Sequence, residues 1–255
     1  MSSTTEANFS LLSSTRYDKE LLGVDWNTRV NGGQPSPFML LPYHFDRLSD
    51  AAKKHGWADT LANFTIQELT RVCVDAVQLA SSKYPDTPLK LRILLARNGE
   101  ISVEAAQTGV LCGCNEALDP APDAARTIYI DPESTSSSIF TSTKTTYRGS
   151  YNSARERLGL SPLQKPSSQH LDVLLHTPEG FVTETSIRNI AFHRGGKWVT
   201  PSAQSGCLPG VMRRLFLEQG RFVEGDVRIK DVILGETVLT VNGVEGCCMG
   251  RITSL

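Results

Sequence analysis

The clearest pattern in the first half of the chain is a repeat of apolar residues at helical spacing between Pro42 and His55, which predicts an amphipathic helix that ends at Gly56. Its apolar face comprises Phe45, Leu48, Ala51 and Ala52, and a second face carries Tyr43, Arg47 and Asp50. A capping box, Thr65-Ile-Gln-Glu68, opens a second predicted helix that runs to Ser81-Ser82. The apolar positions of this second helix are Ile66, Leu69, Cys73, Val77 and Ala80.

The segment that follows has the pattern of a β-hairpin. Two apolar runs, Leu91 to Arg97 and Ile101 to Gln107, flank the dipeptide Asn98-Gly99, which is typical of a tight turn between strands. Two helices and an antiparallel hairpin predict a small α+β domain in the first half of the chain.

The second half of the chain has a different pattern. Residues 115–132 are rich in Pro, Asp and Ala and predict a domain boundary. We therefore assign residues 1–118 to a small N-terminal α+β domain and residues 119–255 to a larger, β-rich C-terminal domain. The elements predicted in the second domain are a helix over 150–158, strands over 171–176, 181–185 and 189–193, a helix from Gly210 to Gly220, and one or two buried strands over 231–241 that include Ile233.

The composition of the chain excludes only a few classes of protein. The chain has 255 residues and a formal net charge of −1, so no overall field favours nucleic acid or an anionic membrane. The chain lacks a signal-peptide pattern and any run of roughly 18 apolar residues, which predicts a cytoplasmic protein. The six cysteines include Cys112-Gly-Cys114 and Cys247-Cys248 but no second pair at zinc-ribbon spacing, so we expect buried thiols and no metal site.

Three segments together supply an amine, an acid and an anion site. Lys144 lies in the run Thr143 to Arg148, Glu184 follows later, and Gly210 precedes a predicted helix. A buried lysine forms a Schiff base with an aldehyde, a carboxylate holds a pyridine nitrogen in its protonated form, and a glycine turn before a helix binds phosphate. These are the needs of pyridoxal 5′-phosphate. If the segment turns into a helix, Arg148 lies one turn from Lys144 and favours its neutral amine.

Each feature also has an ordinary interpretation. A lone lysine among threonines is usually a solvated strand residue, Glu184 fits an exposed strand carboxylate equally well, and glycine often precedes a helix without any ligand. Arg47 is an available cation for a phosphate, although most surface arginines bind nothing specific. We assign no role to His44 or His193.

The order and spacing of these segments are similar to those of the class IV aminotransferases, the fold-type IV pyridoxal phosphate enzymes. The resemblance is carried by Glu184-Thr-Ser-Ile-Arg-Asn189-Ile, Trp198-Val-Thr200-Pro201, Gly206-Cys-Leu-Pro-Gly-Val-Met-Arg213 and, upstream, His44-Phe-Asp-Arg47-Leu48. It implies a two-domain, D-amino acid aminotransferase-like fold of mixed α+β and α/β character. It also implies a homodimer in which the partner subunit completes the site around a small amino substrate.

The resemblance implies a role for several residues. Lys144 is the Schiff-base lysine and Glu184 the partner of the ring nitrogen. The Val211 and Met212 amides form the main phosphate cradle. The resemblance gives assisting positions around the cofactor to Arg47, Asn189, the Asn242-Gly243 turn, Tyr147 and Arg148.

Within the family, Leu11 to Asp18, the Lys-Thr-Thr-Tyr-Arg run and Val241-Asn-Gly-Val most resemble the 4-amino-4-deoxychorismate lyases, especially fungal ones. Those lyases eliminate pyruvate to give 4-aminobenzoate, a folate precursor. This branch implies that Ser14, in place of a threonine, protonates the leaving group, and that Arg16 and Arg92 pair with substrate carboxylates.

Two alternatives remain open. The same machinery serves transamination of a D-amino acid, a branched-chain amino acid or an (R)-amine, because proton abstraction is shared. A fold that binds the cofactor without turnover, or an interaction protein without cofactor, is a further alternative, against which an intact Lys144 and Glu184 argue.

Overall fold

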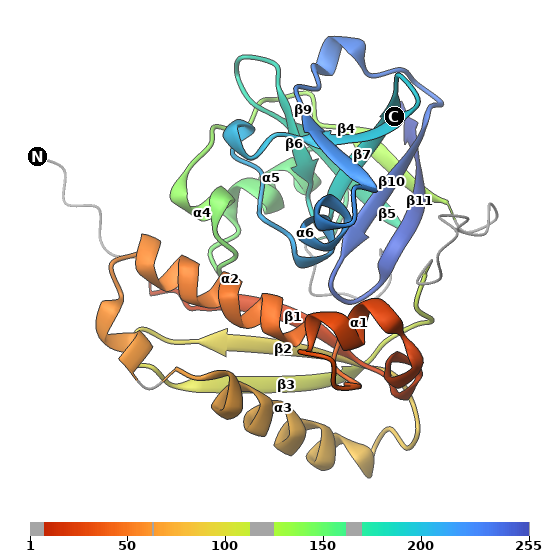
Figure 1. Cartoon of the computed structure of the whole chain (residues 1–255). Coiled ribbons are helices and arrows are strands. Elements are labelled where there is room, and N and C mark those ends of the chain that lie inside the picture. The colour runs from red at the N-terminus through yellow and green to blue at the C-terminus, as the bar shows by residue number, and fades with distance from the viewer. Residues whose placement is uncertain (1–7, 63, 113–124, 162–169, 255) are drawn as a thin grey trace, which may run out of the picture. The chain divides into compact units, whose positions relative to one another are not determined.

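The computed structural model describes residues 8–62, 64–112, 125–161 and 170–254. The chain divides into two compact units: unit 1 comprises residues 1–110 with 143–148, and unit 2 comprises residues 111–142 with 149–255. Figure 1 shows both units. The predicted boundary between residues 118 and 119 lies outside the described residues. The return of residues 143–148 to unit 1 is a feature that the sequence pattern does not indicate.

Unit 1 is built on a three-stranded antiparallel sheet in the order β1-β2-β3. Its strands are β1 (Leu11–Tyr17), β2 (Leu89–Leu95) and β3 (Ile101–Gln107). The predicted hairpin is confirmed as β2 and β3, and Gly99 in its turn has a φ of 87°, which favours glycine. β1 pairs with β2 along its whole length, from Leu11 opposite Leu95 to Tyr17 opposite Leu89.

The helices of unit 1 are α1 (Asp25–Val30), α2 (Leu41–Lys54) and α3 (Ile66–Ser81), together with two short 3-10 turns over Lys19–Gly23 and Ala58–Ala62. Both predicted helices are therefore confirmed. The backbone N–H of Glu68 donates to the Thr65 hydroxyl at 3.1 Å, as a capping box requires, but the Glu68 carboxylate binds Arg71 instead of returning to the cap. One apolar core joins α2 and α3 to the alternate residues of β2. Tyr43, which the sequence pattern places on the face with Arg47 and Asp50, is buried.

Unit 2 contains an eight-stranded mixed sheet in the order β6-β5-β4-β11-β10-β7-β8-β9. Its strands are β4 (Arg126–Ile130), β5 (Leu171–His176), β6 (Val182–Thr185), β7 (Asn189–Arg194), β8 (Lys197–Pro201), β9 (Phe222–Gly225), β10 (Thr237–Asn242) and β11 (Gly246–Thr253). β5, β6 and β7 confirm the three predicted strands. Since the backbone N–H of Val182 on β6 donates to Val227 just beyond β9, the sheet curls until its two edges approach each other.

The helices of unit 2 are α4 (Ile139–Ser142), α5 (Gly149–Arg157) and α6 (Val211–Glu218), together with 3-10 turns over Ala203–Ser205 and Ile229–Asp231. α5 and α6 confirm the two predicted helices. The predicted late strand is β10, but Ile233 is 65% exposed in the loop before it, so its expected burial is wrong. The loop there is held by Glu236, whose carboxylate accepts from the Ile233 N–H.

Two general features of the described residues bear on function. None of the described helices is long and apolar enough to cross a membrane. Among the same residues, no group of three or more His, Cys, Asp or Glu side chains is arranged to hold a metal ion. Cys73, Cys207, Cys247 and Cys248 are buried thiols, as expected, whereas Cys112 is half-buried and Cys114 lies outside the described residues.

Candidate active site

Lys144 lies in an extended segment beside β1 of unit 1. The backbone N–H of Leu12 donates to the Lys144 carbonyl at 2.8 Å, and the Thr146 N–H donates to the Ser10 carbonyl at 2.9 Å. The segment is not helical, so the condition under which Arg148 would lie one helical turn from Lys144 is not met. Lys144 is half-buried, and its backbone is hydrogen-bonded to the start of β1. These hydrogen bonds fix the position from which the lysine side chain extends.

The next residue of β1, Ser13, meets the polar side chains of α2. The Arg47 Nη2 donates to Ser13 Oγ at 2.7 Å, and Ser13 Oγ lies 2.7 Å from His44 Nδ1. Because a guanidinium has no acceptor, Arg47 is the donor to Ser13, whereas the direction of the Ser13–His44 hydrogen bond depends on the His44 tautomer. Burial, together with the charges of Arg47 and Lys144, lowers the pKa of His44 well below its usual value.

Glu184 is a buried carboxylate on β6 of unit 2 and is only 4% exposed. Its Oε1 accepts from the Tyr151 hydroxyl at 2.7 Å and from the Leu208 N–H at 3.3 Å. Its Oε2 lies 3.5 Å from Asn189 Nδ2. Glu184 is thus a fixed acceptor in the interior and not an exposed strand carboxylate.

The N-terminus of α6 is shaped for the close approach of a polar group. Gly210 is its cap residue, and within the described structure no side chain caps the helix. A Cβ on Gly210 would overlap with Oδ1 of Asn189, whose amide also donates to the Leu208 carbonyl at 2.8 Å. Glycine is therefore required here by close packing. The Val211 and Met212 N–H groups lie at the positive end of the helix dipole, which attracts an anion.

The side chain of Asn242 is used inside its own turn. Its Oδ1 accepts from the Val244 N–H at 2.9 Å and from the Glu245 N–H at 2.8 Å, while Nδ2 donates to Glu245 Oε2 at 2.6 Å. Asn242 therefore shapes the turn between β10 and β11. A ligand contact from this turn is expected from its backbone and not from the Asn242 amide.

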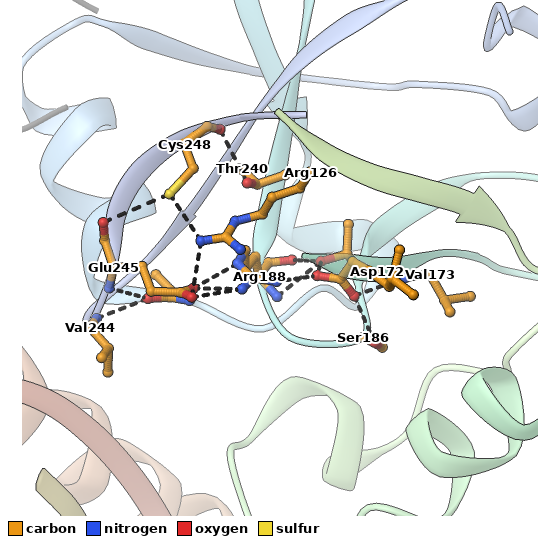
Figure 2. A network of polar contacts seen from close by, with 12 residues as sticks. Arg126, Asp172, Val173, Ser186, Arg188, Thr240, Val244, Glu245 and Cys248 are labelled. Carbon is orange, nitrogen blue, oxygen red and sulfur yellow. Dashed lines mark hydrogen bonds and ion pairs between the residues drawn. The ribbon is translucent and has the colours of Figure 1, made fainter. Parts of the chain in front are cut away.

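Glu245 belongs to a buried chain of ion pairs that Figure 2 shows. Arg188 donates from Nε and Nη2 to Glu245, at 2.8 Å and 2.9 Å, and from Nη1 to Asp172 at 2.8 Å. Arg126 donates to Glu245 at 3.0 Å. Burial acts to raise the pKa of Glu245, but the charges of Arg188 and Arg126 outweigh it and lower the pKa. This network connects β4, β5 and the start of β7 to the turn between β10 and β11.

The residues predicted to contact substrate lie on one face of the unit 1 sheet. Ser14 on β1 is directly opposite Arg92 on β2, and Arg16 is two residues further along β1. Arg92 is half-buried and lies 3.4 Å from Glu104. Arg16 is buried, pairs with Asp18 at 2.8 Å and donates to the Gly109 carbonyl at 2.8 Å. The Arg16 guanidinium is thus engaged within its own unit.

Comparison with known proteins assigns the chain to a family. The family described as amino-transferase class IV matches residues 27–251. The chain belongs to the class IV aminotransferase family. Among curated relatives of this class IV protein, the "Putative aminodeoxychorismate lyase" of Schizosaccharomyces pombe is 33% identical over 216 residues, which is 83% of each chain. The "Aminodeoxychorismate lyase" of Saccharomyces cerevisiae is 35% identical over 138 residues, 49% of this chain and 36% of that protein.

A solved structure supports the fold. The structure described as a "Putative amino-acid aminotransferase" from Mesorhizobium loti aligns with a TM-score of 0.71 and 23% identity, covering 96% of this chain and all of that one. At this identity the similarity establishes the fold alone. The class IV protein therefore has the expected fold-type IV architecture, and it is an enzyme of that family.

The sequence pattern did not assign a role to three polar residues that contact predicted site residues. Ser13 and His44 hold Arg47, and Tyr151 holds Glu184. The motif that contains His44 was recognised, but no role was assigned to the histidine. Nothing in the local pattern singles out Tyr151, whose partner lies 33 residues later.

Proposed function

We propose that this class IV enzyme is a pyridoxal 5′-phosphate-dependent 4-amino-4-deoxychorismate lyase, which eliminates pyruvate to form 4-aminobenzoate. The observation that carries the proposal is the 33% identity to the S. pombe protein of that name along 83% of both chains. The fungal S. cerevisiae relative carries the same activity in its name. The family resemblance further supports a homodimer as the active form.

The residues of unit 2 fit the cofactor. A phosphate needs backbone donors, and α6 begins at Gly210 without a side-chain cap in the part of the chain that the structure describes. A protonated pyridine nitrogen needs a fixed anionic acceptor, and Glu184 is a buried carboxylate held by three donors. These features support assigning the phosphate to the Val211 and Met212 amides and the ring nitrogen to Glu184.

The residues of unit 1 supply the amine and a second cation. When bound, pyridoxal 5′-phosphate supplies an aldehyde that links to amines and a ring that accepts electrons. In this proposal Lys144 holds the cofactor through its Nζ before substrate arrives and then takes the proton from the amine-bearing carbon of the substrate. Arg47, fixed by Ser13, adds its charge to the phosphate site.

Elimination also requires a proton for the leaving enolpyruvyl group and partners for two carboxylates. We assign proton donation to Ser14, which is half-buried on β1. Arg92, directly opposite Ser14, is the stronger candidate for a substrate carboxylate. Arg16 is a weaker one because Asp18 and a backbone carbonyl already take its donors. Arg148 and Tyr147 stay assigned to the cofactor surroundings by resemblance.

The decisive experiment measures 4-aminobenzoate and pyruvate released from freshly made aminodeoxychorismate, with Lys144→Ala as the control. Equal amounts of the two products, lost in the variant, are expected. Borohydride treatment should fix the cofactor to the peptide that contains Lys144, and a label on another lysine would refute the assignment. A cofactor-loaded enzyme that forms no product would instead direct the search to amino donors for transamination, and a protein that takes up no cofactor would refute both.

A further inference from the structure

A tyrosine that the family signature does not contain holds the predicted partner of the ring nitrogen. Tyr151 reaches from α5 to Glu184 on β6, and its hydroxyl lies 2.7 Å from Oε1. The hydroxyl also lies 3.4 Å from the Thr141 carbonyl. A phenol has one proton, so the shorter contact with the charged acceptor takes it.

The tyrosine has little freedom to leave this position. Its side chain is 8% exposed and packs in an apolar cluster with Ala154, Leu158, Leu160, Val173 and Leu175. Glu184 is equally enclosed at 4% exposure. Because both groups are buried, the hydrogen bond between them acts at low local dielectric, where it has a strong effect on charge.

The hydrogen bond also fixes the direction of the carboxylate. Oε1 receives two donors, the Tyr151 hydroxyl and the Leu208 N–H at 3.3 Å. Oε2 has a longer contact, 3.5 Å from the Asn189 amide. The shortest of these contacts to the Glu184 carboxylate is therefore the one from Tyr151 to Oε1.

We propose that Tyr151 is a positioning residue for Glu184, which keeps this carboxylate ionised and oriented so that it holds the cofactor ring nitrogen in its protonated form. This inference rests on the proposed function, in which Glu184 is the partner of that nitrogen. A donor to a carboxylate stabilises its charged form, whereas burial without a donor favours the neutral acid. Without the Tyr151 hydroxyl, the proton shared between the ring nitrogen and Glu184 therefore moves toward Glu184.

The test compares the holoenzyme of the parent protein with that of Tyr151→Phe, each loaded with pyridoxal 5′-phosphate labelled with ¹⁵N in the ring. The chemical shift of the ring nitrogen reports its protonation. Loss of one charge-assisted hydrogen bond is expected to lower the ratio of protonated to neutral nitrogen about tenfold. Tyr129→Phe is the matched control, because Tyr129 packs against the same apolar cluster and should leave the ratio unchanged.

A second variant covers the case in which Tyr151→Phe fails to fold. Replacement of Tyr151 by 3-fluorotyrosine keeps the ring and strengthens the donor, so the ratio is expected to rise. A ring nitrogen with the same shift in the parent and both Tyr151 variants would overturn the role of Tyr151 while leaving the proposed function intact. A parent protein that binds no cofactor, or one whose ring nitrogen is neutral, would overturn the proposed role of Glu184 and this inference together.

Discussion

Replacement of Arg188 by methionine should destabilise unit 2 strongly, because it leaves the buried Asp172 carboxylate and the partly buried Glu245 carboxylate without their shared partner. Arg188 is 3% exposed and makes three hydrogen bonds of 2.8–2.9 Å to Glu245 and Asp172. Removal of one member of a buried ion pair costs about 3–5 kcal/mol. The Arg126 contact with Glu245 persists in the variant, which keeps the expected loss within this range.

Hydrogen exchange resolved by peptide is the suitable assay, since it measures opening free energies of the two units separately. Protection should fall for β5, β7 and β11 of unit 2 and stay unchanged for β2 and β3 of unit 1. Arg71→Met is the matched control, because Arg71 also contacts two carboxylates, those of Glu68 and Asp75. These ion pairs are exposed to solvent and therefore contribute little to stability.

A double variant separates the effect of losing the Arg188 hydrogen bonds from the effect of the negative charges that Arg188 no longer balances. Arg188→Met with Asp172→Asn neutralises one of the two carboxylates that lose Arg188 and should recover part of the lost protection. A decrease of less than about 1 kcal/mol in the opening free energy of unit 2 in Arg188→Met would show that solvent already screens these ion pairs and would refute their proposed role in stability.

Three further predictions test other parts of the site. Burial and the charges of Arg47 and Lys144 lower the pKa of His44 in the folded protein. As pH falls, His44 therefore binds a proton in the unfolded chain at a higher pH than in the folded chain. The parent protein should therefore lose up to about 1.4 kcal/mol per pH unit below pH ~6.5 relative to His44→Asn, and equal slopes in urea titrations would contradict this. Gly210→Ala should cost about 1–3 kcal/mol and weaken cofactor binding in equilibrium dialysis, because the new Cβ overlaps with Asn189, whereas Gly23→Ala, with no atom within 4 Å, should change neither. Glu184→Gln should retain cofactor but lower kcat about a hundredfold in the product assay, and full activity would remove Glu184 from the mechanism.

The elements that the sequence predicted are those whose pattern is local. α2 and α3 follow from apolar spacing alone, and the hairpin of β2 and β3 follows from Asn98-Gly99 between two apolar runs. Glu184 and Gly210 were found through the motif around them, and the structure gives both an interior setting consistent with the motif. Local patterns and motifs therefore find the residues that carry the proposed chemistry.

The partners of those residues are set by contacts that no local pattern contains. The Leu12 N–H that holds the Lys144 carbonyl is supplied from the far end of unit 1 in sequence. The Arg188 network joins residues of β4 and β5 to Arg188 just before β7 and to Glu245 in the turn between β10 and β11, and its charges resemble ordinary surface residues until the sheet brings them together. A charged residue is buried when its partner is present, and the partner is a property of the fold.

β1 shows most directly why polar patterns mislead at a functional site. The run Ser13 to Arg16 has the composition of a solvated loop, yet it forms a strand that is paired on its whole length with β2. Its polar side chains are satisfied inside the protein: Ser13 by His44 and Arg47, Thr15 by the Met39 carbonyl at 2.7 Å. A strand that holds the Lys144 segment by its backbone and Arg47 by Ser13 needs hydrogen-bonding side chains in its interior. Because these side chains are polar, β1 has no apolar alternation, and an analysis of apolar periodicity does not identify it as a strand.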